Sequence, residues 1–301
     1  MPRVNQIDKA TEEVLRLAES ENAIIWDSGF MYAGEGPRNA LTGHQYQGWN
    51  AFNLNILGTL RGYEDPRFVT YLQAKSLGGF VPSSSSGKGI HISQRMGAYP
   101  SRTDKDSNGE SVLIPRYKWR TVWNVGDCEE LELEPLNTEP IFDPIAKADS
   151  IVSGYANGPE VVHAEAQCAH YVPSVDRVVM PPRSWFGENA SAYYSTLFHE
   201  LGHSTGHPDR LDRKIKDQDK HTPGEVYGLE ELVAEFTSLN LCNYAGVKKT
   251  RDSSVHYLAH WLRVLRKNKR MLHQAVTRAE KATQFILGNN NKTKEEDEND
   301  R

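Results

Sequence analysis

His199-Glu200-Leu201-Gly202-His203 is an HExxH motif, in which two histidines lie four residues apart and a glutamate follows the first. Residues four apart share one face of an α-helix, so both imidazoles can bind one metal ion while Glu200 faces the remaining coordination position. Residues 188–198 carry apolar side chains at helical spacing, and two prolines at 181–182 mark a break before them. The motif therefore predicts a helix that carries a zinc site, with Glu200 as its general base.

A mononuclear zinc site needs a third protein ligand, and three carboxylates are candidates. Asp209 completes an HExxHxxGxxD pattern, which is similar to the metzincin motif with Asp in place of the third His. Further along the chain, Glu231 and Glu235 lie one helical turn apart. Glu231 can then bind the metal while Glu235 accepts a hydrogen bond from the free N–H of a ligand histidine, a gluzincin-like arrangement. Apolar neighbours give this segment a buried face, so we favour Glu231, with Glu230 and Asp209 as alternatives.

Length and composition limit the class of protein. A chain of 301 residues predicts two domains, each with its own core. Three cysteines, without metal-type spacing, fit a reducing compartment better than a disulfide framework. The sequence has no apolar stretch of membrane-spanning length and no apolar leader at its start. We therefore expect a cytoplasmic protein without a membrane partner.

Charge is distributed unevenly along the chain. Residues 38–120 hold 11 Lys and Arg against 5 Asp and Glu, interleaved with ten aromatic residues, whereas residues 127–160 hold nine acids and one lysine among several prolines. We place the domain boundary in this acidic stretch. The expected organisation is an N-terminal domain over 1–130, an acidic, proline-rich linker over 131–160, a second domain over 161–288 and a disordered tail over 289–301.

Local periodicity predicts an α+β fold in two domains. In the first domain, we expect helices at 7–20, at 51–60 and from Pro66, and strands at 89–93 and 111–125. In the second, we expect strands at 161–164 and 171–181, the HExxH helix, and helices at 225–245, 253–268 and 271–287. The strand near residues 178–180 is expected to present its edge to an extended peptide.

Basic residues mixed with aromatic ones suit a protein that binds single-stranded nucleic acid. Cations neutralise phosphates, and exposed rings stack on open bases at ~1–3 kcal/mol per base. Residues 42–50 predict a loop that exposes rings, and the Gly- and Ser-rich residues 78–89 predict a flexible hairpin tip with donors for phosphate. The alternative is that the rings form a core. The expected contacts to single-stranded DNA are Arg38, Asn39, Tyr46, Trp49 and Lys88.

The sequence resembles the ArdC-type antirestriction proteins over nearly its whole length. Residues 37–50, 77–79 and 122–125 are similar to the N-terminal domain of that family. Its zincin-like metallopeptidase domain is matched by three segments, at residues 171–176, 199–207 and 230–235. The resemblance implies a plasmid-associated protein whose N-terminal domain binds single-stranded DNA and which protects incoming plasmid DNA from host restriction.

These residues predict a hydrolytic mechanism. His199, His203 and Glu231 would bind Zn²⁺ or another divalent metal, and Glu200 would take a proton from the water that attacks a peptide carbonyl. A host restriction enzyme or another protein would be the substrate. Two other interpretations remain open: a DNA-binding or restriction-blocking protein with a structural zinc, and a cytosolic metallopeptidase whose N-terminal domain binds protein. The presence of Glu200 favours catalysis, because folding requires the metal ligands but not the base.

Overall fold

The computed structural model describes residues 36–105, 109–136, 143–213, 226–247 and 269–289, together with Thr11, Glu12 and Arg16. Several expected segments lie outside the described residues: most of the helix at 7–20, the helix at 253–268 and the tail beyond residue 289. No helix in the described part of the chain combines the length and the apolar character needed to cross a membrane.

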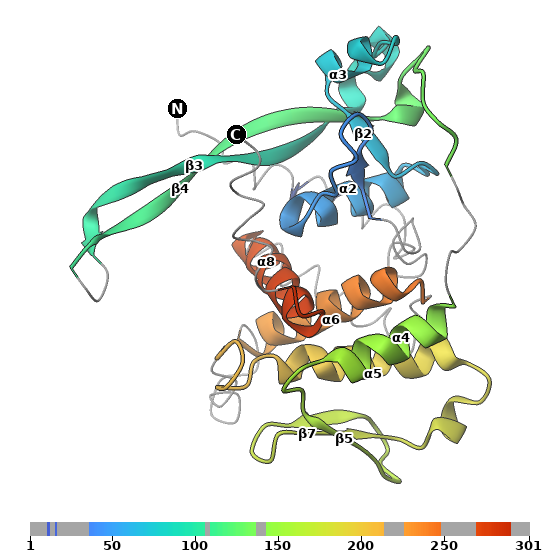
Figure 1. Ribbon diagram of the computed structural model, residues 1–301, viewed down its shortest axis with the longest axis vertical. Helices are drawn as coiled ribbons and strands as arrows, with labels where there is room; N and C mark the ends of the chain where they lie inside the picture. The colour runs from blue at the N-terminus through green and yellow to red at the C-terminus, as the bar shows by residue number, and fades with distance from the viewer. Residues whose placement is uncertain are drawn as a thin grey trace. The chain divides into compact units, whose positions relative to one another are not determined.

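The chain folds into two compact units, whose elements are coloured along the sequence in Figure 1. The ribbon unit contains residues 37–46 and 67–136, and the helical unit contains residues 47–66 and the described residues from 143 onward. One unit is built on a sheet and the other on packed helices with a small sheet, so the fold is α+β, as predicted. The units differ from the expected domains because residues 47–66 pack with the second half of the chain.

Helix α2 (Gly48–Leu60) joins the helical unit through its apolar face. Trp49 and Phe52, three residues apart, are both buried. The centroid of the Phe52 ring lies 5.0 Å from that of Phe236, and the Trp49 ring lies 5.3 Å from the ring of His273. The prediction that Trp49 is exposed in a loop is therefore wrong, because its ring belongs to the core of the helical unit.

Four strands of the ribbon unit form one sheet in the order β1-β2-β4-β3, counting only described residues. Their bounds are β1 Arg38–Asn39, β2 Arg67–Val69, β3 Ile90–Lys105 and β4 Ser111–Asn124. β1 runs parallel to β2, whereas β2 and β3 run antiparallel to β4.

The short helix α3 (Tyr71–Ser76) follows β2 and corrects one sequence prediction. Thr70 and Gln73 form a capping box at its start, in which each side chain accepts a hydrogen bond from the backbone N–H of the other. The helix expected from Pro66 is therefore a strand followed by a later helix. Pairing of residues 67–69 with β4 keeps the backbone extended until the cap at Thr70.

β3 and β4 form a long two-stranded ribbon (Figure 1). The pairing runs from Ile90 opposite Val122 to Lys105 opposite Ser111, with a bulge after Arg95. β3 is thus much longer than the strand predicted at 89–93. Residues at the base of the ribbon are buried, whereas most described side chains farther along both strands are exposed.

The helical unit contains a second, small sheet with the order β5-β7-β6. Its strands are β5 (Glu160–His163), β6 (His170–Val172) and β7 (Arg177–Met180). β7 pairs with β5 in parallel and with β6 in antiparallel orientation. The prediction that the strand near residues 178–180 offers a free edge is wrong, because β7 is the central strand and both its edges are paired.

Helix α4 (Pro144–Gly154) lies in the stretch that the sequence suggested to be a linker. The side chain of Asp143 accepts a hydrogen bond from the N–H of Ile145, and Pro144 fits the first turn. Ala148 is fully buried in the core of the helical unit. Part of the acidic, proline-rich stretch is therefore a packed helix, and its proline marks a helix start.

Three longer helices complete the described part of the helical unit: α5 (Ala190–Ser204), α6 (Val226–Ala245) and α8 (Lys269–Ile286). They match the predicted HExxH helix and the helices predicted at 225–245 and 271–287. α6 packs against both α5 and α8. Buried side chains from these helices, from α4 and from β7 form an apolar cluster that includes Leu197, Phe198 and Leu201 of the HExxH helix.

Replacing Trp49 by alanine is expected to destabilise the helical unit by about 3–5 kcal/mol, since a large buried ring is removed and the cavity closes only in part. Trp185→Ala is the matched control in the same unit, because the Trp185 side chain is 59% exposed and surface changes usually cost no more than ~0.5 kcal/mol. Chemical denaturation followed by circular dichroism measures both. Equally small effects would place Trp49 outside the core.

Candidate metal centre

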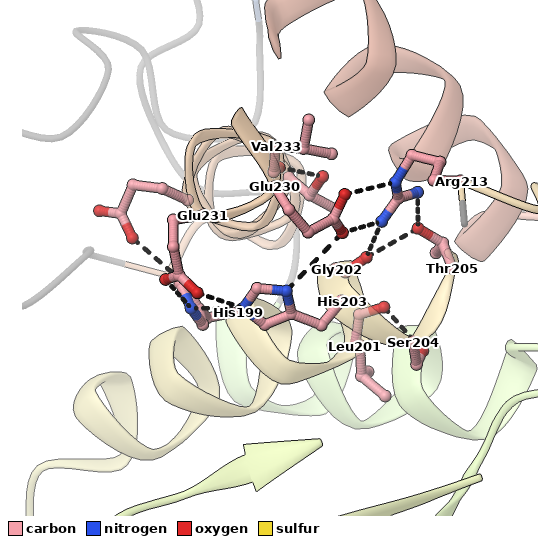
Figure 2. A network of polar contacts seen from close by, with 12 residues as sticks. His199, Leu201, Gly202, His203, Ser204, Thr205, Arg213, Glu230, Glu231 and Val233 are labelled. Carbon is pink, nitrogen blue, oxygen red and sulfur yellow. Dashed lines mark hydrogen bonds and ion pairs between the residues drawn. The ribbon is translucent and has the colours of Figure 1, made fainter. Parts of the chain in front are cut away.

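Helix α5 carries the HExxH motif and is fixed at its start and along one face. The side chain of Asn189 accepts a hydrogen bond from the backbone N–H of Ala192 at 3.0 Å, which caps the helix. One face packs into the core of the helical unit through Tyr194, Leu197, Phe198 and Leu201. His199 and His203 point instead toward α6, as Figure 2 shows.

Gly202 sets how closely α5 and α6 approach. A Cβ atom at this position would lie 2.9 Å from the Cα of Ala234 and 3.2 Å from the Cβ of Thr237. Real Cβ atoms almost never come within 3.0 Å of a backbone atom, so any larger residue would push the helices apart. The glycine between the two histidines therefore brings the carboxylates of α6 to the imidazoles of α5.

Three donor atoms converge where the two helices cross. The Nε2 atoms of His199 and His203 are 3.1 Å apart, and the carboxylate of Glu231 lies 3.6 Å from the first and 3.4 Å from the second. Ligands at about 2.0–2.1 Å from a tetrahedral zinc ion are roughly 3.3–3.4 Å apart. These three residues are the group in the described chain whose donor atoms lie close enough together to hold a metal ion. The set of two imidazoles and one carboxylate fits a divalent cation such as Zn²⁺.

Two further carboxylates face the other nitrogen of each imidazole. The Glu235 carboxylate lies 3.2 Å from Nδ1 of His199, and the Glu230 carboxylate lies 3.7 Å from Nδ1 of His203. A histidine that binds metal through Nε2 carries its proton on Nδ1, so a carboxylate acceptor there selects the binding tautomer. The structure thus places Glu235 where the sequence predicted it, and it assigns the matching place at His203 to Glu230.

The carboxylates make the site favourable for positive charge. Burial opposes protonation of His199, but Glu231 and Glu235 outweigh it and raise the pKa of His199 to about 10. Burial alone would raise the pKa of Glu231, yet its interaction with His199 lowers it. A metal cation bound here would supply the charge that a proton supplies otherwise.

Glu200 lies on α5 between the two histidines and is 7% exposed. Its negative charge also contributes to the raised pKa of His199. A carboxylate at this place has the position of a general base in an HExxH site.

Asp209, the alternative third ligand, does not belong to the group of donor atoms. Its side chain is 88% exposed, and its carboxylate lies 3.7 Å from Nδ1 of His207. The chain turns after α5, so Asp209 faces solvent while α6 supplies the carboxylate at the site. The metzincin-like alternative is therefore wrong.

Two of the predicted DNA contacts instead stabilise the ribbon unit. Asn39 is buried: its side-chain amide donates to Gln73 at 3.0 Å, and its side-chain carbonyl accepts from the backbone N–H groups of Leu41 and Thr42. Tyr46 is half-buried, with its hydroxyl 3.4 Å from the Asn39 amide, and burial raises its pKa. Both residues hold the turn after β1.

The other predicted DNA contacts differ in accessibility. Lys88 is half-exposed and forms an ion pair of 2.7 Å with the buried Asp127. It ends a 3₁₀ turn (Ser83–Lys88) that packs under Trp123, whose indole N–H donates to the carbonyl of Ser85 at 3.1 Å. This segment is therefore not the flexible hairpin tip that the sequence suggested. Arg38 is half-buried in β1, and Trp49 is in the core of the helical unit.

Sequence reasoning missed two buried arginines after α5, Arg210 and Arg213. Arg213 pairs with Glu230, and Arg210 pairs with Asp176. The available signal was the pair of arginines three residues apart directly after the HExxH helix. Nothing in their local spacing indicates which carboxylate each one meets.

Two families match separate parts of this chain. The N-terminal domain of the anti-restriction factor ArdC matches residues 5–123, and the zincin-like metallopeptidase family matches residues 146–278. The crystal structure of the antirestriction protein ArdC from plasmid R388 is similar in both its forms, at 28% identity. The metal-free form has a TM-score of 0.71 and covers 94% of this chain and 97% of that one; the Mn(II)-bound form has a TM-score of 0.72 and covers 95% and 98%.

Three further proteins are similar in sequence to most of this chain. Two proteins named DNA primase TraC, both from Escherichia coli, are 34% identical over 266 residues and 30% identical over 267 residues. The alignments cover 83% of this chain but only 24% and 17% of those proteins, so the chain spans less than a quarter of their length. Protein y4eC of Sinorhizobium fredii is 27% identical over 254 residues, which is 80% of its length.

Fold and site together define a two-domain protein that joins an ArdC-type N-terminal domain to a zincin-like metallopeptidase domain. Each of the two domains matches its own family model, and the chain resembles the antirestriction protein ArdC from plasmid R388 over nearly its whole length. The zincin-like domain implies a divalent metal, and His199, His203 and Glu231 are the residues placed to hold it.

Removing the Glu231 carboxylate is expected to weaken metal binding far more than removing that of Asp209. Glu231→Ala deletes a proposed ligand and should raise the Kd for Zn²⁺ by more than ~100-fold, since outer partners of ligands alone cost about 10–100-fold. Asp209→Ala should leave the Kd within about twofold, because its carboxylate faces solvent. Competition with a coloured chelator measures both values. A larger loss in Asp209→Ala would return the site to the metzincin-like arrangement.

Proposed function

We propose that this chain is an antirestriction protein that acts in the cytoplasm, binds single-stranded DNA through its ribbon unit and hydrolyses a peptide bond at its metal centre. One observation carries the hydrolytic part: within the described residues, three protein ligands converge, His199, His203 and Glu231, and Glu200 is buried beside them. Structural zinc sites use four protein ligands, whereas catalytic sites use three and keep one position open. The donor set therefore supports a catalytic site.

Zinc is the proposed metal, because two imidazoles with one carboxylate are a donor set of catalytic zinc sites. Other divalent ions also suit this set. The Mn(II)-bound structure of the R388 ArdC protein supports that wider range for its relatives.

The chain's own residues supply the remaining parts of the mechanism. A divalent cation held by the three ligands would polarise the scissile carbonyl and acidify the attacking water. Glu200 takes the proton from that water and passes it to the leaving amine, which regenerates the base. Glu235 and Glu230 hold the two imidazoles in the tautomer that leaves Nε2 free.

The ribbon formed by β3 and β4 supports single-stranded DNA binding better than the residues first expected. The two strands hold six Lys and Arg against a single Asp, and no other acid. Exposed rings accompany the charges: Tyr99 is 51% exposed and Tyr117 is 55% exposed. Cations placed along a strand with accessible rings can neutralise phosphates and stack on open bases.

Residues 116–120 of β4, Arg-Tyr-Lys-Trp-Arg, separate the two kinds of contact. Successive side chains of a strand point to opposite faces, so Arg116, Lys118 and Arg120 share one face and Tyr117 and Trp119 share the other. The guanidinium of Arg120 also donates a hydrogen bond across the ribbon to Gln94 at 3.1 Å. Within this segment, the cations therefore lie on one face of the ribbon and the rings on the other, whereas Tyr99 of β3, which pairs with Ile114, lies on the face of the cations.

Single-stranded DNA binding is expected to depend on this ribbon. The double variant Arg116→Gln/Lys118→Gln should lower the slope of log K against log salt by about 1.4, since each phosphate contact to a single strand contributes roughly 0.7. Tyr117→Ala should cost about 1–3 kcal/mol of binding free energy. Fluorescence anisotropy with a labelled oligonucleotide at several salt concentrations measures both. A larger loss in Lys88→Gln than in either variant would move the contact to the 3₁₀ turn.

A Glu200→Ala variant separates hydrolysis from binding. All three proposed ligands remain, so metal content and single-stranded DNA affinity should stay as in the wild type. Protection of a restriction-sensitive plasmid during transfer should nevertheless be mostly lost, and His199→Ala should lose it too. Full protection by metal-loaded Glu200→Ala would leave a protein that blocks restriction by binding, with a structural metal. If the wild-type protein cleaves peptides but has no affinity for DNA, the result would favour a metallopeptidase whose ribbon unit binds protein.

A further inference from the structure

Two buried arginines follow helix α5 and fix its end in different ways. The side chain of Arg213 is 6% exposed and that of Arg210 is 2% exposed. A buried guanidinium is tolerated only when a carboxylate and further acceptors satisfy it. Each arginine has its own carboxylate, Glu230 for Arg213 and Asp176 for Arg210.

Arg213 connects the end of α5 to the start of α6, as Figure 2 shows. Its Nε donates to one carboxylate oxygen of Glu230 at 2.9 Å, and an Nη atom donates to the other at 2.5 Å. The guanidinium also donates to the Thr205 hydroxyl at 2.6 Å and to the carbonyl of Gly202 at 2.9 Å. Both oxygens of Glu230 are therefore held in one orientation by a planar fork.

The same Glu230 carboxylate faces a metal ligand. Its Oε1, which accepts from Arg213, is also the oxygen that lies 3.7 Å from Nδ1 of His203. For His203 to bind a metal through Nε2, Nδ1 must carry the proton and needs an acceptor on that side. Glu230 is adjacent in sequence to Glu231, so a free Glu230 would be a competing carboxylate beside the ligand.

We propose that Arg213 is a positioning residue of the metal centre. Because Arg213 donates hydrogen bonds to both oxygens of Glu230, it orients this carboxylate toward Nδ1 of His203 and away from the position where Glu231 would bind the metal. It thereby sets the affinity and the geometry of the bound metal without touching it. This role of Arg213 rests on metal binding by the three proposed ligands and does not require that the site hydrolyse a peptide bond.

Arg210 is a matched control for the structural part of this role. Its Nε donates to the carbonyl of Ser204 at 2.7 Å, and its Nη atoms donate to Asp176, to the hydroxyl of Tyr171 and to the carbonyl of Asn157. It is as deeply buried as Arg213 and anchors the same end of α5. None of these partners faces a proposed metal ligand.

The test compares Arg213→Lys with Arg210→Lys in the full-length chain. Lysine keeps the positive charge but cannot form the bidentate hydrogen bonds of arginine, so both variants should lower the melting temperature. Arg213→Lys should also raise the Kd for Zn²⁺ by about 10–100-fold, the range for outer partners of metal ligands, while Arg210→Lys should leave it within about threefold. The visible absorption bands of Co²⁺-loaded protein should shift only in Arg213→Lys, because they report ligand geometry.

A double-variant cycle tests whether Arg213 acts through Glu230. In a Glu230→Ala background, Arg213→Met should cause no further loss of metal affinity, since the carboxylate that it positions is already absent. Additive losses would overturn the proposal, as would equal losses of affinity in the two lysine variants. Wild-type protein that fails to bind Zn²⁺ would refute the metal centre itself, whereas wild-type binding with an unchanged Arg213→Lys would refute only the positioning role.

Discussion

The close crossing of α5 and α6 at Gly202 is the constraint on which the metal centre depends. No side chain separates Gly202 from the backbone of Ala234, and a single methyl group would already clash. Histidines on one helix and glutamates on the other meet only because the two backbones come this near. The apolar residues of α5 and α6 bury the rest of the crossing, so the core holds the distance that the ligands require.

Charge balance is the second principle of the site. Three glutamates of α6 surround two histidines, and two of them, Glu231 and Glu235, outweigh the effect of burial and raise the pKa of His199 to about 10. Such a pocket stabilises any cation placed at the imidazoles, whether a proton or a metal ion. Arg213 forms an ion pair with Glu230 and neutralises its charge, so the three carboxylates have different partners and different orientations. Buried charges of this kind are stable only as a complete set.

The two units differ in the size of their apolar cores and in how much of their surface is exposed. The helical unit buries a large apolar cluster and can hold side chains at fixed distances, which metal binding requires. The ribbon unit has a small core around Val69, Ala74 and Val125, and most of its long ribbon is exposed. An exposed, basic, aromatic ribbon suits a flexible polymer, because phosphates and bases can be contacted along its length. Asn39 and Tyr46 serve that unit by holding the turn after β1.

Short-range pattern in the sequence determined the helices and the ligands that lie on them. The spacing of His199 and His203, and that of Glu231 and Glu235, follows from the helical repeat, so the α+β class and the favoured third ligand could be inferred without a structure. The helical repeat puts both carboxylates on one face, and the structure places Glu231 at the two Nε2 atoms and Glu235 at Nδ1 of His199.

Only the tertiary structure decided which distant residues meet. The pairing of Arg213 with Glu230, the burial of Trp49 against His273 and the central place of β7 join residues far apart in the chain, and no local period encodes such contacts. The length of β3 was likewise not predicted, although β4 matches the strand expected at 111–125, because the exposed part of β3 has no buried face to impose alternation of polar and apolar residues. Periodicity reports which face of a segment is buried, whereas the identity of the partner depends on how the whole chain packs.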